Sequence, residues 1–334
     1  MTSKETLSYH QKMNLQEVFD SYDGRLRLVE LKIRELFRNK IPFIPLIGEY
    51  IIASGGKRLR PLFHLISADI AGYQGEASID IASIIESIHT ASLLHDDVVD
   101  TAEVRRGKPS ANAVWGNQIV VLVGDFLYSN ALRAAVMQRS QKIMEALSGA
   151  TTRMTEGELL QLNKVGNPDI TEAEYLEIIS AKTGALISAA CRVGAILGGL
   201  SEEEENALAG FGMKTGMVFQ MADDILDYMA EENDLGKKLC KDLEEGKITL
   251  PLLLLLSDAE EKDRTEIKGI IKDFSDKDSE RIMDLLKKYR SIEASLKKAE
   301  ELIEGARADL SLFPESRAKD ALLAIADYSL RREK

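Results

Sequence analysis

Cysteine is scarce in this sequence, with two among 334 residues, Cys191 and Cys240. Two isolated cysteines form neither a metal-ligand cluster nor a disulfide framework, which is typical of a reducing compartment. The first 14 residues lack the basic start and apolar core of a signal peptide, so we expect a cytoplasmic location. The strongest apolar run, residues 250–256, is too short to span a bilayer, and we expect it to begin a buried helix.

Proline and glycine are also few, with 7 and 23 residues. Ala, Leu, Ile, Glu and Lys fill most of the chain, which favours helices. Apolar residues recur at helical spacing from about Leu15 onward, without the sustained alternation of a half-buried strand. No stretch resembles an interdomain linker, so the sequence predicts one all-α domain over residues 1–334.

Positive charge is in deficit, because 43 Lys and Arg face 55 Asp and Glu, which gives a formal net charge of −12. This balance argues against nucleic acid or an anionic membrane surface as the main partner. Any anionic ligand must therefore be held by a local group of cations.

Two carboxylate motifs share one spacing, Asp96-Asp97-Val98-Val99-Asp100 and Asp223-Asp224-Ile225-Leu226-Asp227. Each follows apolar sequence, and in a helix residues four apart share a face, so Asp96 points with Asp100 and Asp223 with Asp227. One such motif could simply decorate an exposed helix end. Two of them favour a pair of facing walls that bind Mg²⁺ together with a diphosphate, since Mg²⁺ takes few protein carboxylates and completes its shell with phosphate and water.

Cations lie close to these motifs in the sequence. Lys57 and Arg60 follow a glycine pair where backbone amides can approach an anion, and we expect Arg58 between them to be structural. His89 lies two helical turns before Asp96 and is interpreted as a phosphate donor rather than a core histidine. The remaining candidate phosphate ligands are Arg105, Arg106, Lys182, Thr183, Gln220 and Lys237.

These residues resemble the trans-isoprenyl diphosphate synthases, and most closely the long-chain polyprenyl members. The resemblance rests on GGKRLRP at 55–61, LLHDDVVDTAEVRRGKPSAN at 93–112, GDFL at 124–127, KTG at 182–184, GMVFQMADDILD at 216–227 and DLEEGKITLP at 242–251. It implies a helical bundle around a deep central cavity, a Mg²⁺-dependent prenyltransferase with three ions when substrate is bound, and a homodimer. We expect no nucleic-acid partner and only a transient membrane contact for product release.

The resemblance also implies a role for each position. Isopentenyl diphosphate would be bound by Lys57, Arg60, His89 and Arg106, and the allylic diphosphate by Arg105, Lys182, Thr183, Gln220 and Lys237. Mg²⁺ would be bound by Asp96, Asp100 and Asp223, with Asp97, Asp224 and Asp227 in support. One departure is local, because many relatives have proline and glycine where Lys238 and Cys240 stand.

Product length is expected to depend on the helix that carries the first motif. A growing chain would pass Ser92 and Ala91, then Ile88 and, one turn later, Ile84 or Ile85. Shorter-chain relatives commonly have a bulky aromatic residue at the position of Ala91 or Ser92, so small residues imply a long product. The alternatives are a geranylgeranyl-type synthase, a terpene cyclase and a non-catalytic subunit of a two-component synthase.

Overall fold

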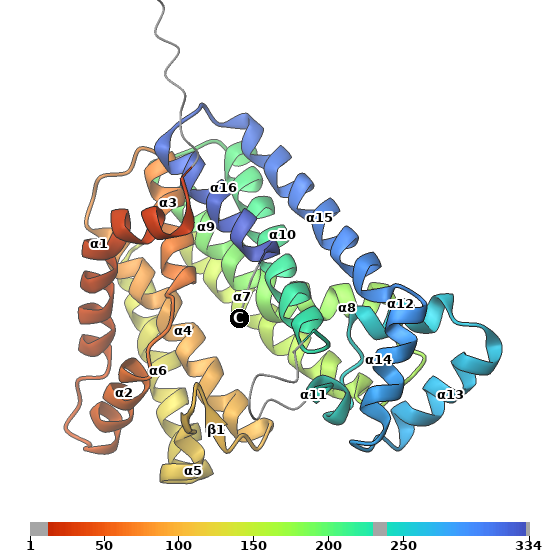
Figure 1. The fold of residues 1–334 in the computed structure, drawn as a ribbon. Helices are drawn as coiled ribbons and strands as arrows, with labels where there is room; N and C mark the ends of the chain where they lie inside the picture. The colour runs from red at the N-terminus through yellow and green to blue at the C-terminus, as the bar shows by residue number, and fades with distance from the viewer. Residues whose placement is uncertain (1–12, 230–238, 332–334) are drawn as a thin grey trace, which may run out of the picture.

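The structure is a computed structural model that describes residues 13–229 and 239–331, and α-helices dominate it (Figure 1). The first part of the chain forms α1 (Leu15–Leu36), α2 (Phe43–Ala53), α3 (Leu59–Ile70), α4 (Ala77–Val99), α5 (Ala111–Trp115), α6 (Asn117–Met137) and α7 (Gln141–Lys164). The second part forms α8 (Glu172–Ile179), the π-helix η1 (Ser180–Gly184), α9 (Ala185–Gly198), α10 (Glu202–Leu226), α11 (Lys241–Glu244), α12 (Leu250–Asp258), α13 (Glu261–Lys272), α14 (Asp278–Lys288), α15 (Ser291–Asp309), the 3-10 turn η2 (Leu310–Leu312) and α16 (Arg317–Leu330). The predicted all-α class is confirmed.

A small antiparallel hairpin follows the first carboxylate motif, with β1 (Val104–Arg105) paired to β2 (Lys108–Pro109). Arg106 and Gly107 at its tip have φ angles of 53° and 73°. A two-residue turn with positive φ at both positions suits the twist of a hairpin. Strands of two residues are too short to show an alternating pattern in the sequence.

A polar cap marks the start of α10. The Ser201 side chain accepts a hydrogen bond from the Glu204 backbone N–H, and the Glu204 carboxylate accepts one from the Ser201 N–H. This reciprocal pair satisfies two N–H groups that would otherwise lack partners at the start of α10. The acidic run from Glu202 therefore begins a helix and has no place in the site.

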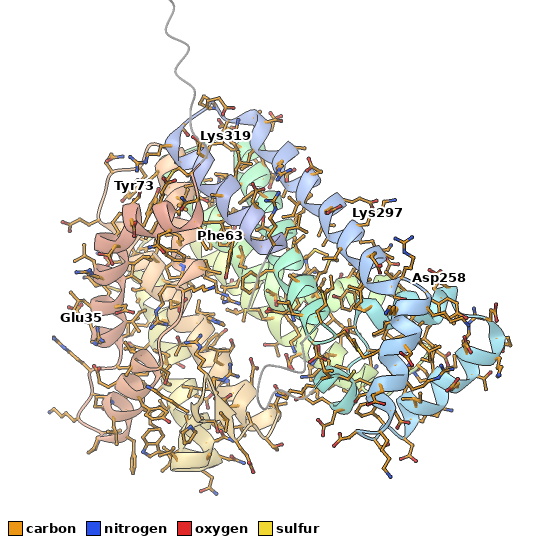
Figure 2. All side chains as sticks on the ribbon, in the orientation of Figure 1. Glu35, Phe63, Tyr73, Asp258, Lys297 and Lys319 are labelled. Carbon is orange, nitrogen blue, oxygen red and sulfur yellow. The ribbon has the colours of Figure 1, made fainter. Side chains whose placement is uncertain are left out.

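The centre of the bundle is built from α3, α4, α9 and α10. α9 packs against α3, α7 and α10, while α4 packs against α6 and α10 against α15. Phe63 of α3 is buried beside Phe211 of α10, with 6.3 Å between ring centroids. Figure 2 shows Phe63 inside the bundle, whereas Glu35 and Lys297 lie on its outer faces.

α6 is the one helix in the described residues that is long and apolar enough to cross a membrane, judged by length and composition alone. The sequence had not indicated this helix as a candidate membrane span. It packs against α4 within the bundle, and core helices commonly pass the same test. Its outer side exposes Leu122, Val136 and Met137.

Candidate active site

A cavity of about 930 Å³ opens between α3, α4, α6, α7, η1 and α10. This volume is at the upper end of the usual range for ligand pockets. Thirteen of the residues singled out from the sequence line it: Lys57, Arg60, Ile88, His89, Ala91, Ser92, Asp96, Arg105, Arg106, Lys182, Thr183, Gln220 and Asp223. Lys237 lies outside the described residues.

The first carboxylate motif ends α4, and its three aspartates have different surroundings. Asp96 lines the cavity, and burial together with the nearby Glu158 raises its pKa to about 6. Asp97 is buried and accepts a 2.6 Å hydrogen bond from Arg105 Nε. Asp100 is exposed at the C-terminal cap of α4, where Lys247 Nζ lies 3.9 Å from its carboxylate. Asp97 thus orients Arg105, whereas Asp96 faces the cavity.

The second motif ends α10, and its three aspartates also have different surroundings. Asp223 lines the cavity, but Asp224 is buried beside it and accepts hydrogen bonds from Tyr175 Oη at 2.7 Å and Gln220 Nε2 at 2.9 Å. Asp227 accepts the backbone N–H groups of Lys241 and Asp242 at the start of α11. The start of α11 thus holds the Asp227 carboxylate in place, and its supporting role at the metal site stays a prediction.

Cations gather at the end of the cavity formed by the loop before α3. Arg60 and Arg106 line this end with His89, and within the described structure Arg60 Nε is buried without a hydrogen-bond partner. Burial and the neighbouring arginines hold the pKa of His89 well below its usual value, so the ring is neutral and one nitrogen can donate. A Cβ at Gly56 would lie 2.8 Å from Arg106 Nη1 and would displace this guanidinium, and the φ of 149° at Gly56 is one that residues with side chains rarely adopt.

Arg58 has the structural position that the sequence predicted. It caps α3 with φ 49°, and its side chain is 8% exposed. Its Nη1 donates to Glu86 Oε1 at 3.0 Å, and its Nε lies 3.4 Å from Glu30 Oε1. Lys57 Nζ contacts the hydroxyl of Tyr328 on α16 and lies 4.6 Å from the centre of its ring.

Lys182 enters the cavity from η1, and a single turn of π-helix within an α-helix is frequently found at functional sites. Gly216 of α10 permits this turn to lie close, since a Cβ there would be 2.9 Å from Gly184 Cα. One turn later, Gln220 Oε1 accepts a 2.9 Å hydrogen bond from Thr183 Oγ1. Gln220 therefore connects Thr183 with Asp224, and all three belong to one hydrogen-bonded chain.

Several cavity residues were not recognised from the sequence. Glu158 of α7 pairs with Lys182 at 2.6 Å, and Glu86 lines the cationic end. Lys247 and Asp242 do not line this cavity but contact Asp100 and Asp227, and the DLEEGKITLP stretch that contains them could have indicated both. Nothing in the sequence distinguished Glu158, because the same helix also carries the exposed Glu156 two residues earlier.

The carboxylates fit a cation that takes part of its ligands from a substrate. Among residues 13–229 and 239–331, no three His, Cys, Asp or Glu side chains are grouped so that they could hold a metal by themselves. Asp96 and Asp223 supply hard oxygen ligands from two helices, and the pKa of Asp96 is raised first by burial and then by the negative charge of Glu158, which a cation would offset. Mg²⁺ suits this donor set, since it keeps water and binds substrate phosphates.

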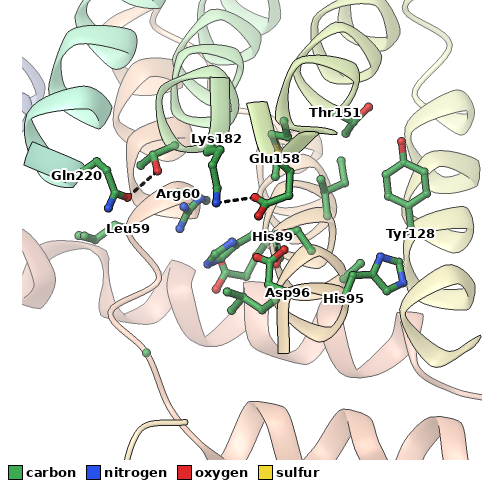
Figure 3. A pocket seen from close by; sticks show the side chains of 18 of the residues that line it. Leu59, Arg60, His89, His95, Asp96, Tyr128, Thr151, Glu158, Lys182 and Gln220 are labelled. Atoms are coloured by element: carbon green, nitrogen blue, oxygen red, sulfur yellow. Dashed lines mark hydrogen bonds and ion pairs between the residues drawn. The ribbon is translucent and has the colours of Figure 1, made fainter. Parts of the chain in front are cut away.

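The residues expected along the path of a growing chain line the cavity only in the first part of that path. Ser92, Ala91 and Ile88 line the cavity, whereas Ile84 and Ile85 are buried in the core and do not line it. The wall also includes His95 of α4 itself and, from neighbouring helices, Tyr128 of α6 and Thr151 of α7 (Figure 3). The direction of the cavity depends on packing between helices and could not be derived from α4 alone.

Comparison with known proteins gives consistent results. Residues 42–289 match the family model described as polyprenyl synthetase. Octaprenyl diphosphate synthase of Escherichia coli K12 is 38% identical over 323 residues, which cover 96% of this chain and all of that protein.

Solved structures agree in fold over nearly the whole chain. A decaprenyl diphosphate synthase from Rhodobacter capsulatus has a TM-score of 0.91 at 37% identity, covering 95% of this chain and 98% of that one. A polyprenyl synthase from Caulobacter crescentus, complexed with calcium and isoprenyl diphosphate, has a TM-score of 0.89 at 36% identity, covering 97% and 99%. With two aspartate motifs and a group of cations lining one cavity, this chain belongs to the polyprenyl synthetase family.

Proposed function

We propose that this protein is a Mg²⁺-dependent prenyltransferase that joins isopentenyl diphosphate head-to-tail to an allylic diphosphate, farnesyl diphosphate or a similar starter. The product is a long all-trans polyprenyl diphosphate of about six to eight isoprene units. The observation that carries this proposal is one cavity with two kinds of anion site. Asp96 and Asp223 lie with Lys182 near one, and Arg60, Arg106 and His89 form the other.

The reaction begins when the allylic C–O bond breaks and its electron pair leaves with the diphosphate. Arg105 and Lys182 stabilise the charge that develops on this leaving group, because donors placed in a shielded site act most strongly where charge appears. Bound Mg²⁺ adds positive charge at the same diphosphate. Asp97 holds Arg105, and the Thr183 to Gln220 hydrogen bond keeps the neighbouring wall in place.

Arg60, Arg106 and His89 hold the diphosphate of isopentenyl diphosphate so that its double bond faces the allylic cation. The double bond attacks the cation and forms the new C–C bond. A proton is then lost to the released diphosphate, which leaves an allylic diphosphate one unit longer. Ile88, Ala91 and Leu93 supply apolar wall that excludes water from the cation.

The residues that line the cavity also favour this function over the alternative functions. A terpene cyclase needs no second diphosphate site such as that formed around Arg60 and Arg106. A non-catalytic subunit would be expected to have lost one carboxylate motif, and both Asp96 and Asp223 line the cavity. A geranylgeranyl-type synthase is disfavoured by the small Ala91 and Ser92, and by relatives named for octaprenyl and decaprenyl products.

The test is product chromatography with purified protein, farnesyl diphosphate and labelled isopentenyl diphosphate. We expect Mg²⁺-dependent all-trans products of about six to eight units, and none after chelation of the metal. Products that stop at four units would support the geranylgeranyl-type alternative. Cyclised hydrocarbon without uptake of the label would contradict the proposal.

The proposal includes a homodimer in the cytoplasm. Exposed Leu122, Val136 and Met137 on α6 support the dimer, because exposed apolar residues on one element are typical of an interaction surface. Light scattering should give twice the mass of the 37.0 kDa chain.

A further inference from the structure

Lys182 meets two acceptors that both come from α7. Its Nζ lies 2.6 Å from Glu158 Oε2 and donates to Gln161 Oε1 at 3.0 Å. Residues three apart on a helix share a face, so Glu158 and Gln161 approach the lysine from the same side. The contact depends on Gly157, because a Cβ there would lie 2.6 Å from Ala181 Cβ and 3.1 Å from the Lys182 backbone nitrogen.

The number of donors on an ammonium group limits what Lys182 can bind besides these two acceptors. Lysine has three N–H donors and no acceptor. Two of them are occupied by Glu158 and Gln161, which restricts rotation of the group about its last C–N bond and leaves one N–H. In Figure 3 Lys182 reaches into the same space as Asp96 and His89, with its dashed contact to Glu158.

We propose that Glu158 is a positioning residue which, with Gln161, holds the Lys182 ammonium so that its remaining N–H is directed to the allylic diphosphate. The inference deepens the proposed function and rests on it. Glu158 touches no reacting atom and acts through Lys182.

The rival interpretation is that Glu158 competes with the substrate for Lys182. A carboxylate in a cavity that binds two diphosphates disfavours anions by its charge, and Glu158 also raises the pKa of Asp96. A pure competitor, however, would need to be displaced, whereas an ammonium with three donors can keep both α7 partners and still bind a phosphate oxygen. The two interpretations predict opposite effects when the carboxylate is removed.

The experiment compares Glu158→Ala, Glu158→Gln and a control, Glu156→Gln, which changes an exposed carboxylate on the same helix. Steady-state kcat and KM are measured for each substrate in turn, with the thermal midpoint as a check on folding. Displacement of a catalytic contact by about 1 Å can reduce the rate 100-fold. We therefore expect Glu158→Ala to lower kcat about 10- to 100-fold, with KM for isopentenyl diphosphate unchanged.

Glu158→Gln should recover most of this loss, to within about 5-fold of wild type, because its amide oxygen can still accept from Lys182. Glu156→Gln should match wild type. Unchanged kcat in folded Glu158→Ala, or a lower KM for the allylic substrate, would overturn the inference in favour of competition. Should Glu158→Ala not fold, a Glu158→Gln enzyme impaired mainly in KM for isopentenyl diphosphate would overturn it equally. A wild-type protein that does not elongate the starter would overturn the proposed function itself.

Discussion

Asp96 and Asp223 are the motif carboxylates that line the cavity, and their neighbours in each motif bind protein groups instead. Asp97 accepts from Arg105, Asp224 from Tyr175, and Asp227 from the backbone of α11. Spacing alone could identify both motifs, because their residue types and offsets are visible in the sequence. It could not assign these separate roles to the aspartates, because each role depends on a hydrogen-bond donor outside the motif.

Asp96→Ala and Asp223→Ala should each lower turnover by at least about 100-fold. Loss of one contact that stabilises transition-state charge typically reduces the rate by this factor or more. The measurement is turnover at saturating substrate and Mg²⁺, with circular dichroism to show that the helices remain. Glu103→Ala is the matched control, because Glu103 is an exposed acid near the first motif that does not line the cavity. Near-normal turnover in either folded aspartate variant would contradict the two-walled site.

α4 carries both Asp96 and the small residues that are proposed to set product length. It presents Asp96 at its C-terminal end, and then Ser92, Ala91 and Ile88 in order toward its N-terminus. The 3.6-residue period allowed this face to be predicted. The far wall beside Tyr128 and Thr151 belongs to α6 and α7, whose placement no pattern within α4 contains.

Ala91→Phe should shorten the product and leave the first condensation intact, because a ring at this buried cavity position would obstruct the growing chain. Chromatography of the products checks the distribution, and the rate of the first addition serves as an internal control. Overpacking typically costs about 1 to 3 kcal/mol of stability, so Ser92→Phe at a half-buried position provides a second variant. An active Ala91→Phe enzyme with an unchanged product distribution would show that the chain does not pass Ala91.

For the molecule as a whole, the junction between α10 and α11 gathers negative charge. Burial and the nearby Asp224 and Asp227 raise the pKa of Asp242 to about 8. The folded protein therefore holds this proton more tightly than the unfolded chain, where an aspartate has a pKa of about 3.9. The resulting contribution to the free energy of unfolding is complete below pH 4 and is lost as the pH rises through about 8.

Asp242→Asn should consequently have a higher thermal midpoint than wild type at pH 8, by several degrees, and the difference should shrink as the pH falls toward 4. The asparagine keeps the shape of the side chain and cannot ionise. Calorimetry in metal-free buffer across this range gives the comparison. A difference that is constant with pH would show that ionisation of Asp242 does not weaken the fold.

The amino-acid sequence by itself determined the helical class, both carboxylate motifs and most of the cations that line the cavity. It could do so because composition, helical period and residue spacing are local properties of the chain. Only the tertiary structure decided which carboxylates face the cavity, why Glu158 rather than Glu156 meets Lys182, and which helices form the wall of the cavity opposite α4. Those choices depend on close contacts between distant elements, such as the approach of α7 to η1 at Gly157, and on packing that places α6 beside α4 and brings α7 to the wall of the same cavity.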